Sequence, residues 1–132
     1  MMKLRLMPLL TLLFLLPMVA TADTIEKISE LIKQGNAHEI AKFFATSVDI
    51  SILDETNVYS KAQSEMILDK FFKENKPHSV KLLHRINSNP NYNFGVLILT
   101  TDKGKFRVSY TLKEVNKVMA IIELRIETEK PN

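Results

Sequence analysis

The fold is decided by residues 79–127, SVKLLHRINSNPNYNFGVLILTTDKGKFRVSYTLKEVNKVMAIIELRIE, in which polar and apolar side chains alternate with a period of two. This alternation predicts four strands: 79–87, 93–101, 105–114 and 118–127. Turn-forming residues separate them: Asn89-Pro90-Asn91, Asp102-Lys103-Gly104 and Asn116-Lys117. Because consecutive strands with such short connections are antiparallel, the stretch predicts a four-stranded meander.

The residues before the meander show the apolar spacing of helices. Three helices are predicted, at 25–34, at 37–44, and from Ser60 to a point before Pro77. Gly35 suits the end of the first helix, Asn36 suits the start of the second, and Ser60-Lys61-Ala62-Gln63 fits a capping box. Between the second and third helices, the pattern predicts a strand at 48–52, a turn at 54–57 and a short strand piece at 58–59. The order is therefore typical of an α+β domain.

Two further stretches resemble a known superfamily. They are GNAHEIAKFFATSVDISILD, residues 35–54, and VYSKAQSEMILDKFFKEN, residues 58–75. They are similar to the second helix with the first strand, and to the third helix, of the nuclear-transport-factor-2-like (cystatin-like cone) superfamily. The resemblance implies a cone-like curved antiparallel sheet packed on three helices, in the order α-α-β-α-β-β-β-β. It is greatest to small exported bacterial members of unassigned function. Enzymes, transport adaptors and binding domains share this fold, so it implies no activity.

The first 22 residues have the pattern of a secretory signal peptide. Lys3 and Arg5 give a basic start, an apolar run follows to Leu16, and Ala20-Thr21-Ala22 supplies small residues for cleavage. The apolar run is shorter than the roughly 20 residues that a membrane-spanning helix needs. We therefore expect export to the periplasm or the medium after cleavage near Ala22, with no stable membrane anchor. Residues 23–132 are expected to form a single domain.

Composition excludes several classes of function. The chain has 18 Lys and Arg against 15 Asp and Glu, and loss of Lys3 and Arg5 would reduce 18 to 16. A nearly neutral mature chain is not expected to bind nucleic acid. There is no cysteine, hence no disulfide or thiolate site, and the three histidines (His38, His78 and His84) lack metal-ligand spacing. No metal and no cofactor are predicted.

Strand alternation also assigns the face of the sheet that lines the cone. Its predicted inward residues are Val80, Leu82, His84, Ile86, Phe94, Val96, Ile98, Phe106, Val108, Tyr110, Leu112, Val118, Ala120, Ile122, Leu124 and Ile126. Five residues are predicted to line a small cavity: Phe71, His84, Val108, Tyr110 and Ile122. His84 and Tyr110 are the catalytic candidates, because an imidazole can act as a general acid or base near neutral pH. The alternative is that both fill the core. Isomerases of the superfamily use an inward carboxylate, and these strand faces have none at their centre.

The other face of the sheet carries apolar residues among charged ones. Leu83, Leu97, Leu99, Met119 and Ile121 are predicted to lie there, between residues such as Lys81, Arg85 and Arg107. Because sheets of similar folds often pair face to face, these five residues predict a homodimer interface. The alternatives are docking on another exported protein, a partly covered face, or a different register.

The sequence thus favours an exported, non-catalytic binding or scaffold domain, with room for a small apolar ligand in the cone. The alternative is a small lyase or isomerase that uses His84 and Tyr110.

Overall fold

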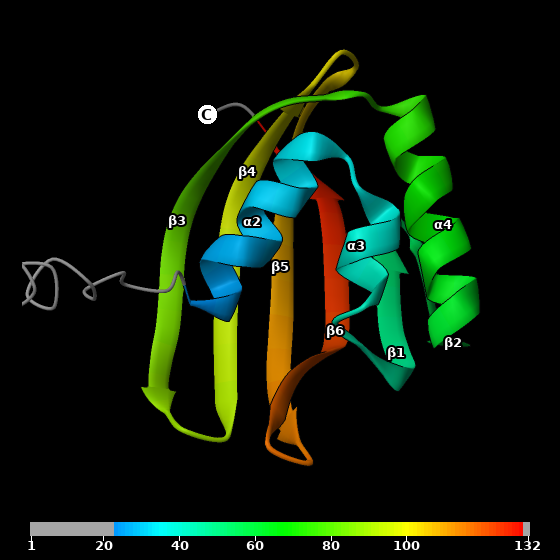
Figure 1. The fold of residues 1–132 in the computed structure, drawn as a ribbon. Coiled ribbons are helices and arrows are strands. Elements are labelled where there is room, and N and C mark those ends of the chain that lie inside the picture. The colour runs from blue at the N-terminus through cyan, green and yellow to red at the C-terminus, as the bar shows by residue number, and fades with distance from the viewer. Residues whose placement is uncertain (1–22, 131–132) are drawn as a thin grey trace, which may run out of the picture.

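The structure is a computed structural model that describes residues 23–130; the predicted signal peptide lies outside them. Three helices and six strands follow one another in this order: α2 (Thr24–Gln34), α3 (Ala37–Ala41), β1 (Phe44–Ile52), β2 (Glu55–Ser60), α4 (Lys61–Glu74), β3 (Pro77–Asn89), β4 (Tyr92–Thr101), β5 (Gly104–Val115) and β6 (Val118–Thr128). Figure 1 shows α2 and α3 in front of the sheet, with α4 beside them. Among the described residues, no helix is long and apolar enough to cross a bilayer.

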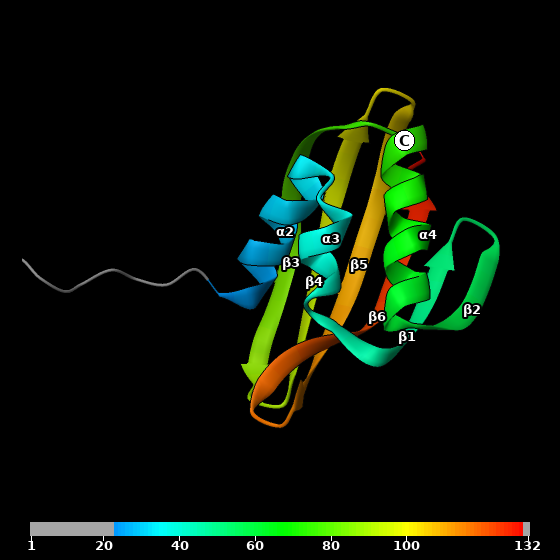
Figure 2. The same ribbon diagram turned by 45° about the vertical axis from the view of Figure 1, so that its right-hand side comes forward.

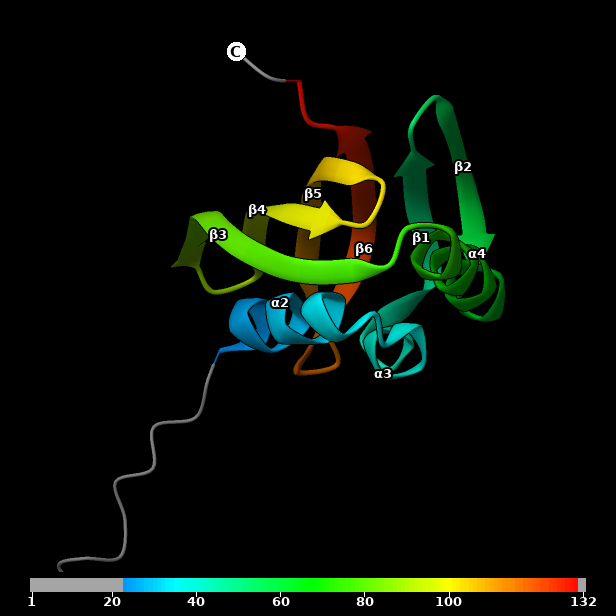
Figure 3. The same cartoon turned by 90° about the horizontal axis from the view of Figure 1, so that it is seen from above.

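The six strands form one curved, unclosed sheet in the spatial order β2-β1-β6-β5-β4-β3. Neighbouring strands are antiparallel except β1 and β6, which are parallel. Seen from above, the sheet bends around the helices, which all lie on one side of it (Figure 3). The predicted α+β order and the cone-like sheet are confirmed, and the short strand piece expected near Val58 is part of β2.

Local sequence explains where the helices begin and end. The side chain of Asp23 accepts a hydrogen bond from the backbone N–H of Glu26 and caps α2. Gly35 ends α2 in the left-handed conformation, with φ of 66°. Ser60 and Gln63 form the predicted capping box at the start of α4.

Some predicted boundaries are wrong because of pairing between strands; the strand predicted at 48–52, for example, begins at Phe44. The second helix stops at Ala41, since Phe44 already pairs with Ile121 of β6 and the Phe43 carbonyl accepts a hydrogen bond of 2.6 Å from the Ile121 N–H. The predicted turn at 54–57 is wrong as well. The chain reverses at Leu53 and Asp54, where Leu53 has φ of 56°, and the following residues already form β2.

A continuous core fills the layer between the helices and the sheet. The helices contribute Ile25, Ile28, Ile32, Ile40, Leu68, Phe71 and Phe72, and the facing strands contribute Leu97, Leu99, Phe106, Val108, Tyr110, Leu112, Ile121, Leu124 and Ile126. Alternation assigned β5 correctly: Phe106, Val108, Tyr110 and Leu112 are all buried. The apolar and polar residues of β5 alternate strictly, so only one orientation buries its apolar side chains.

The predicted faces of β4 are reversed. Leu97 and Leu99, expected on the outer face, are 0% exposed and lie in the core, opposite Val108 and Phe106. The run from Phe94 to Leu99 is apolar at every position except Gly95, so alternation could not choose between its two faces. Phe94, Val96 and Ile98 therefore lie on the outer face and not in the cone.

Irregular pairing reverses the faces of β3 and β6 part-way along each strand. The register of β3 shifts between Leu82 and His84, so Val80 and Leu82 pack on the core while His84 lies opposite Val96 on the outer face. In β6, the pairing passes from Glu123 to Ile121 and leaves Ile122 as an inserted residue. Ile121 is consequently core, and Met119 packs against the core. The predictions that Ile121 and Met119 lie outside are wrong, and so are the predictions that five residues lie inside: His84, Ile86, Val118, Ala120 and Ile122.

Candidate functional site

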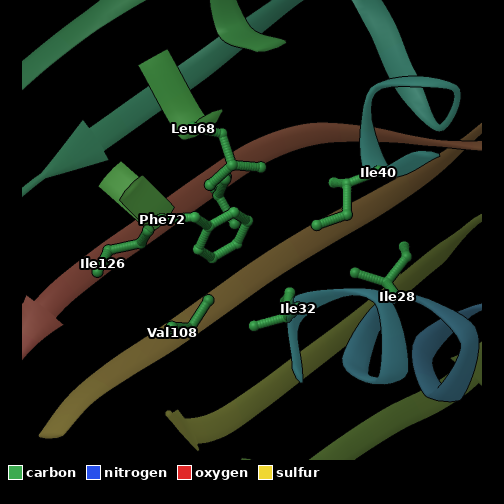
Figure 4. A pocket seen from close by; sticks show the side chains of 8 residues that line it. Ile28, Ile32, Ile40, Leu68, Phe72, Val108 and Ile126 are labelled. Atoms are coloured by element: carbon green, nitrogen blue, oxygen red, sulfur yellow. The ribbon is translucent and has the colours of Figure 1, made fainter. Parts of the chain in front are cut away.

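The interior of the cone is almost completely filled. Its cavity has a volume of about 10 Å³. Figure 4 shows side chains of α2, α3, α4, β5 and β6 that point toward one another around it. All eight lining residues are apolar: Ile28, Ile32, Ile40, Leu68, Phe72, Val108, Leu124 and Ile126. A space of this size is at the lower limit for one water molecule, and no lining side chain could hydrogen-bond to it. The cavity offers no room for a ligand.

The five residues predicted to line one cavity are spread over different parts of the molecule. Val108 lines the filled interior, and Phe71 lies at a groove beside α4. His84 is exposed on β3, and Ile122 is the inserted residue of β6. Tyr110 is fully buried in the core. They form no common site.

Tyr110 has a structural role. Its hydroxyl donates a hydrogen bond of 2.7 Å to the Ile25 carbonyl of α2. Its ring lies against Gly95 of β4, where an added Cβ would come within 2.9 Å of the ring. Burial, and secondarily the negative charge of Asp23, raise the pKa of Tyr110 well above its usual range, although Arg85 opposes this shift. The phenol therefore stays protonated and serves as a hydrogen-bond donor.

His84 lies on the opposite side of the sheet from Tyr110. It is exposed and pairs with Val96, whose side chain is on the outer face. The sheet backbone consequently separates the two catalytic candidates, so they cannot act on one substrate atom. Within residues 23–130, no three His, Asp or Glu side chains are grouped closely enough to hold a metal ion.

A charged cluster connects β3 to the first turn of α2. Arg85 lies 3.0 Å from the Asp23 carboxylate and also pairs with Glu26. The sequence analysis placed Arg85 on the outer face, which is wrong because the shifted register of β3 turns it toward the helices. Because the Arg85 side chain is about one-third exposed, water screens these ion pairs and they add little to the free energy of folding. Their main role is to position α2.

The outer face of the sheet holds an apolar patch, as predicted, but it is formed mostly by other residues than those predicted. We define the outer apolar patch as Leu83, Phe94, Val96 and Ile98, on the adjacent strands β3 and β4. Val96 is only 7% exposed, although no helix of residues 23–130 covers this side of the sheet (Figure 3). Leu83 and Ile98 line a hollow of about 450 Å³, whose rim carries Lys81, Lys105 and Arg107 among others. Of the five predicted interface residues, only Leu83 belongs to this patch.

A second surface feature lies between α4 and the β1–β2 hairpin, and we call it the hairpin groove. Its volume is about 460 Å³. Ile52, Tyr59, Ile67 and Phe71 form an apolar floor, and Leu53, Asp54, Glu55, Lys70, Glu74 and Asn75 complete the lining. Figure 2 shows α4 running alongside this hairpin at one end of the sheet. Part of this hairpin, residues 54–57, is predicted from the sequence to be a turn, and that prediction leaves no groove here.

Comparison with known proteins identifies the family and the fold. A family model described as a domain of unknown function, DUF4783, matches residues 25–127. A DUF4783 protein from Bacteroides uniformis is 26% identical, covers 83% of this chain and 100% of its own, and superposes with a TM-score of 0.79. A cystatin-like domain of unknown function from Nostoc punctiforme is 11% identical, covers 84% of this chain and 81% of its own, and has a TM-score of 0.64.

A de novo designed protein with a curved β-sheet is 14% identical, covers 78% of this chain and 96% of its own, and has a TM-score of 0.61. These similarities confirm the resemblance to the nuclear-transport-factor-2-like (cystatin-like) fold. No curated protein matches the chain.

Proposed function

The chain belongs to the DUF4783 family of domains of unknown function. We propose that it is an exported, non-catalytic scaffold domain that self-associates through the outer apolar patch. The observation that carries the proposal is that both faces of β4 are apolar. Leu97 and Leu99 face the core, while Phe94, Val96 and Ile98 form an apolar surface on the uncovered side.

The outer face of the neighbouring strand β5 is polar by contrast. On the outer face of β5, Arg107, Ser109 and Thr111 alternate with core residues, as expected of a face in contact with water. Contiguous apolar residues on an exposed face are typical of interaction sites. A two-fold dimer buries the same patch on both copies, so the four residues already present supply both halves of the interface.

The proposal includes neither a ligand inside the cone nor an enzyme. The interior cavity of about 10 Å³ is too small for a ligand. His84 and Tyr110 lie on opposite sides of the sheet, and no other observation favours catalysis.

Sedimentation velocity of the wild type and of Ile98→Lys tests the proposal. We expect a wild-type dimer at micromolar concentration and a folded, monomeric variant, because the new lysine would lie between Lys81 and Arg107 on the adjacent strands, and a second copy would bring the same positive charges against it. Glu30→Gln is the matched control: it changes the net charge by the same amount at an exposed residue of α2, on the other side of the sheet, and should remain dimeric. If Ile98→Lys does not fold, Ile98→Ser replaces it. A wild type that sediments as a monomer would contradict the proposal, as would a dimer that survives both Ile98 substitutions.

A further inference from the structure

We infer that the hairpin groove binds an extended peptide segment of another protein, in which an apolar side chain is flanked by lysine or arginine. This binding would be separate from self-association, because the groove and the outer apolar patch lie on different elements of the fold.

Strand β2 lies at one edge of the sheet. Among the described strands it pairs with β1 alone, so one of its sides offers backbone N–H and C=O groups that no other described strand pairs with. Most of β2 is exposed: Glu55, Thr56, Asn57 and Val58 all are. An exposed sheet edge can accept a further strand from another chain. An added strand would lie beside β2, at the end of the sheet where α4 runs (Figure 2).

The apolar floor of the hairpin groove lies next to this edge. Glu65 marks the side of α4 that faces α3, because it pairs with His38 there. Ile67, Lys70 and Glu74 recur at helical spacing on another side and line the groove together with Tyr59 of β2. Alternate side chains of a strand added to β2 would point toward this side of α4. An apolar side chain at the centre of the segment would therefore reach Ile67 and the partly buried Tyr59.

The rim of the hairpin groove is mainly acidic. Asp54, Glu55 and Glu74 carry carboxylates at the rim, and within residues 23–130 none of them forms an ion pair. Lys70 is the single basic residue of the lining, and the nearby Lys73 is already paired with Asp69. The C-terminus of α4, at Glu74, adds the negative end of the helix dipole. A segment with basic side chains on the same strand face as its apolar side chain complements this rim.

Titration of the protein with a synthetic peptide tests the inference. The probe is acetyl-Thr-Lys-Thr-Leu-Thr-Lys-Thr-amide, which presents one leucine and two lysines on one strand face. We expect submillimolar binding that weakens with salt, with NMR shift changes confined to β2, Leu53, Asp54 and the groove side of α4. A peptide with glutamate in place of both lysines should not bind, and neither should spermine, which has the charge without the apolar side chain. N-methylation of alternate peptide amides should abolish binding, because it removes the strand pairing with β2.

Variants of the protein separate this site from general charge attraction. Asp54→Lys combined with Glu55→Lys should weaken binding at least about tenfold, because both substitutions are at the rim. The matched control combines Glu30→Lys with Glu114→Lys, two exposed residues elsewhere, and changes the net charge equally. It should bind the peptide as the wild type does. Absence of binding, equal loss in both double variants, undiminished binding of the N-methylated peptide, or shift changes on the outer face would each overturn the inference. Sedimentation reports none of these outcomes, so either proposal can fail without the other.

Discussion

The hydroxyl of Tyr110, in the middle of β5, donates a 2.7 Å hydrogen bond to the carbonyl of Ile25 in the first turn of α2. The two residues are 85 positions apart, and both are fully buried. The bond fixes the start of the first helix on the centre of the sheet, and Arg85 fixes the same turn from β3 through Asp23 and Glu26. A side chain that the sequence analysis considered for catalysis is thus an anchor between the two layers.

Tyr110→Phe should destabilise the fold by about 1 kcal/mol, because it removes one buried hydrogen bond and keeps the ring. Urea denaturation of both proteins measures the difference. Tyr92→Phe is the control, since Tyr92 is 43% exposed and should be unaffected. An unchanged midpoint for Tyr110→Phe would show that the bond to Ile25 contributes nothing to stability.

The same residue predicts a pH dependence. The pKa of Tyr110 is raised in the folded protein, chiefly by burial, so the unfolded chain releases the phenol proton at lower pH than the folded one. The stability that Tyr110 contributes through its raised pKa is fully present below the usual tyrosine pKa of 10.0, and it is lost as the pH rises above that value. The wild type should therefore lose more stability than Tyr110→Phe between about pH 9 and about pH 11. Parallel losses in urea denaturation at the two pH values would contradict the shift.

Gly95→Ala should destabilise the fold by about 1–3 kcal/mol through overpacking. The new Cβ would lie 2.9 Å from the Tyr110 ring and 3.0 Å from Cγ2 of Ile25, so two core side chains would have to move. Ser109→Ala, on the adjacent strand, is expected to change stability by less than about 0.5 kcal/mol. Thermal melts of both variants decide the matter, and a wild-type melting temperature for Gly95→Ala would mean that Tyr110 does not pack closely on β4.

The face of a strand could be predicted only where apolar and polar residues alternate regularly along it and its pairing has no shift. The regular strand β5 was assigned correctly, because Phe106, Val108, Tyr110 and Leu112 alternate with polar residues. The face of β4 could not be predicted, because its apolar run fits either orientation. The shifts at Leu83 and Ile122 arise from pairing between strands and leave no signal in the sequence of one strand. The candidate sites therefore failed where residues on β3, β4 and β6 had to share a face.

Leu97→Ala and Leu83→Ala together test the corrected faces of the sheet. Leu97 is 0% exposed, so its truncation should cost about 2–5 kcal/mol. Leu83 is half-buried on the outer face and should cost much less in a monomer. Leu99→Lys would bury a charge in the core and should not fold, whereas an interface position would tolerate it as a monomer. Urea denaturation and circular dichroism measure these differences, and equal costs for the two alanine variants would contradict the assigned faces.

Export should produce a chain that begins at Asp23. This follows from the signal-peptide pattern of residues 1–22, which predicts cleavage after Ala22. Asp23 is the cap of α2 and Ile25 is core, so a chain cleaved after Ala22 keeps the whole first helix with its cap. Intact mass of protein recovered from the cell envelope or medium gives the first residue. Ala20→Lys with Ala22→Lys should block processing, and a wild-type chain that still carries residues 1–22 would contradict the prediction.

Ser64 in α4 and Ser60, the N-cap of that helix, are expected to respond differently to alanine. The Ser64 hydroxyl is fully buried and has no hydrogen-bond partner among the described residues. Ser64→Ala removes this unpaired group and introduces a better helix former, so stability should stay the same or rise by up to about 1 kcal/mol. Ser60 instead caps the helix by accepting a hydrogen bond of 3.2 Å from the Gln63 N–H. Ser60→Ala should therefore cost about 1 kcal/mol. Because each change removes one hydroxyl, one inside α4 and one at its N-cap, urea denaturation compares their environments directly. A clear loss of stability in Ser64→Ala would mean that this hydroxyl has a partner, and an unchanged Ser60→Ala would mean that the capping box does not stabilise α4.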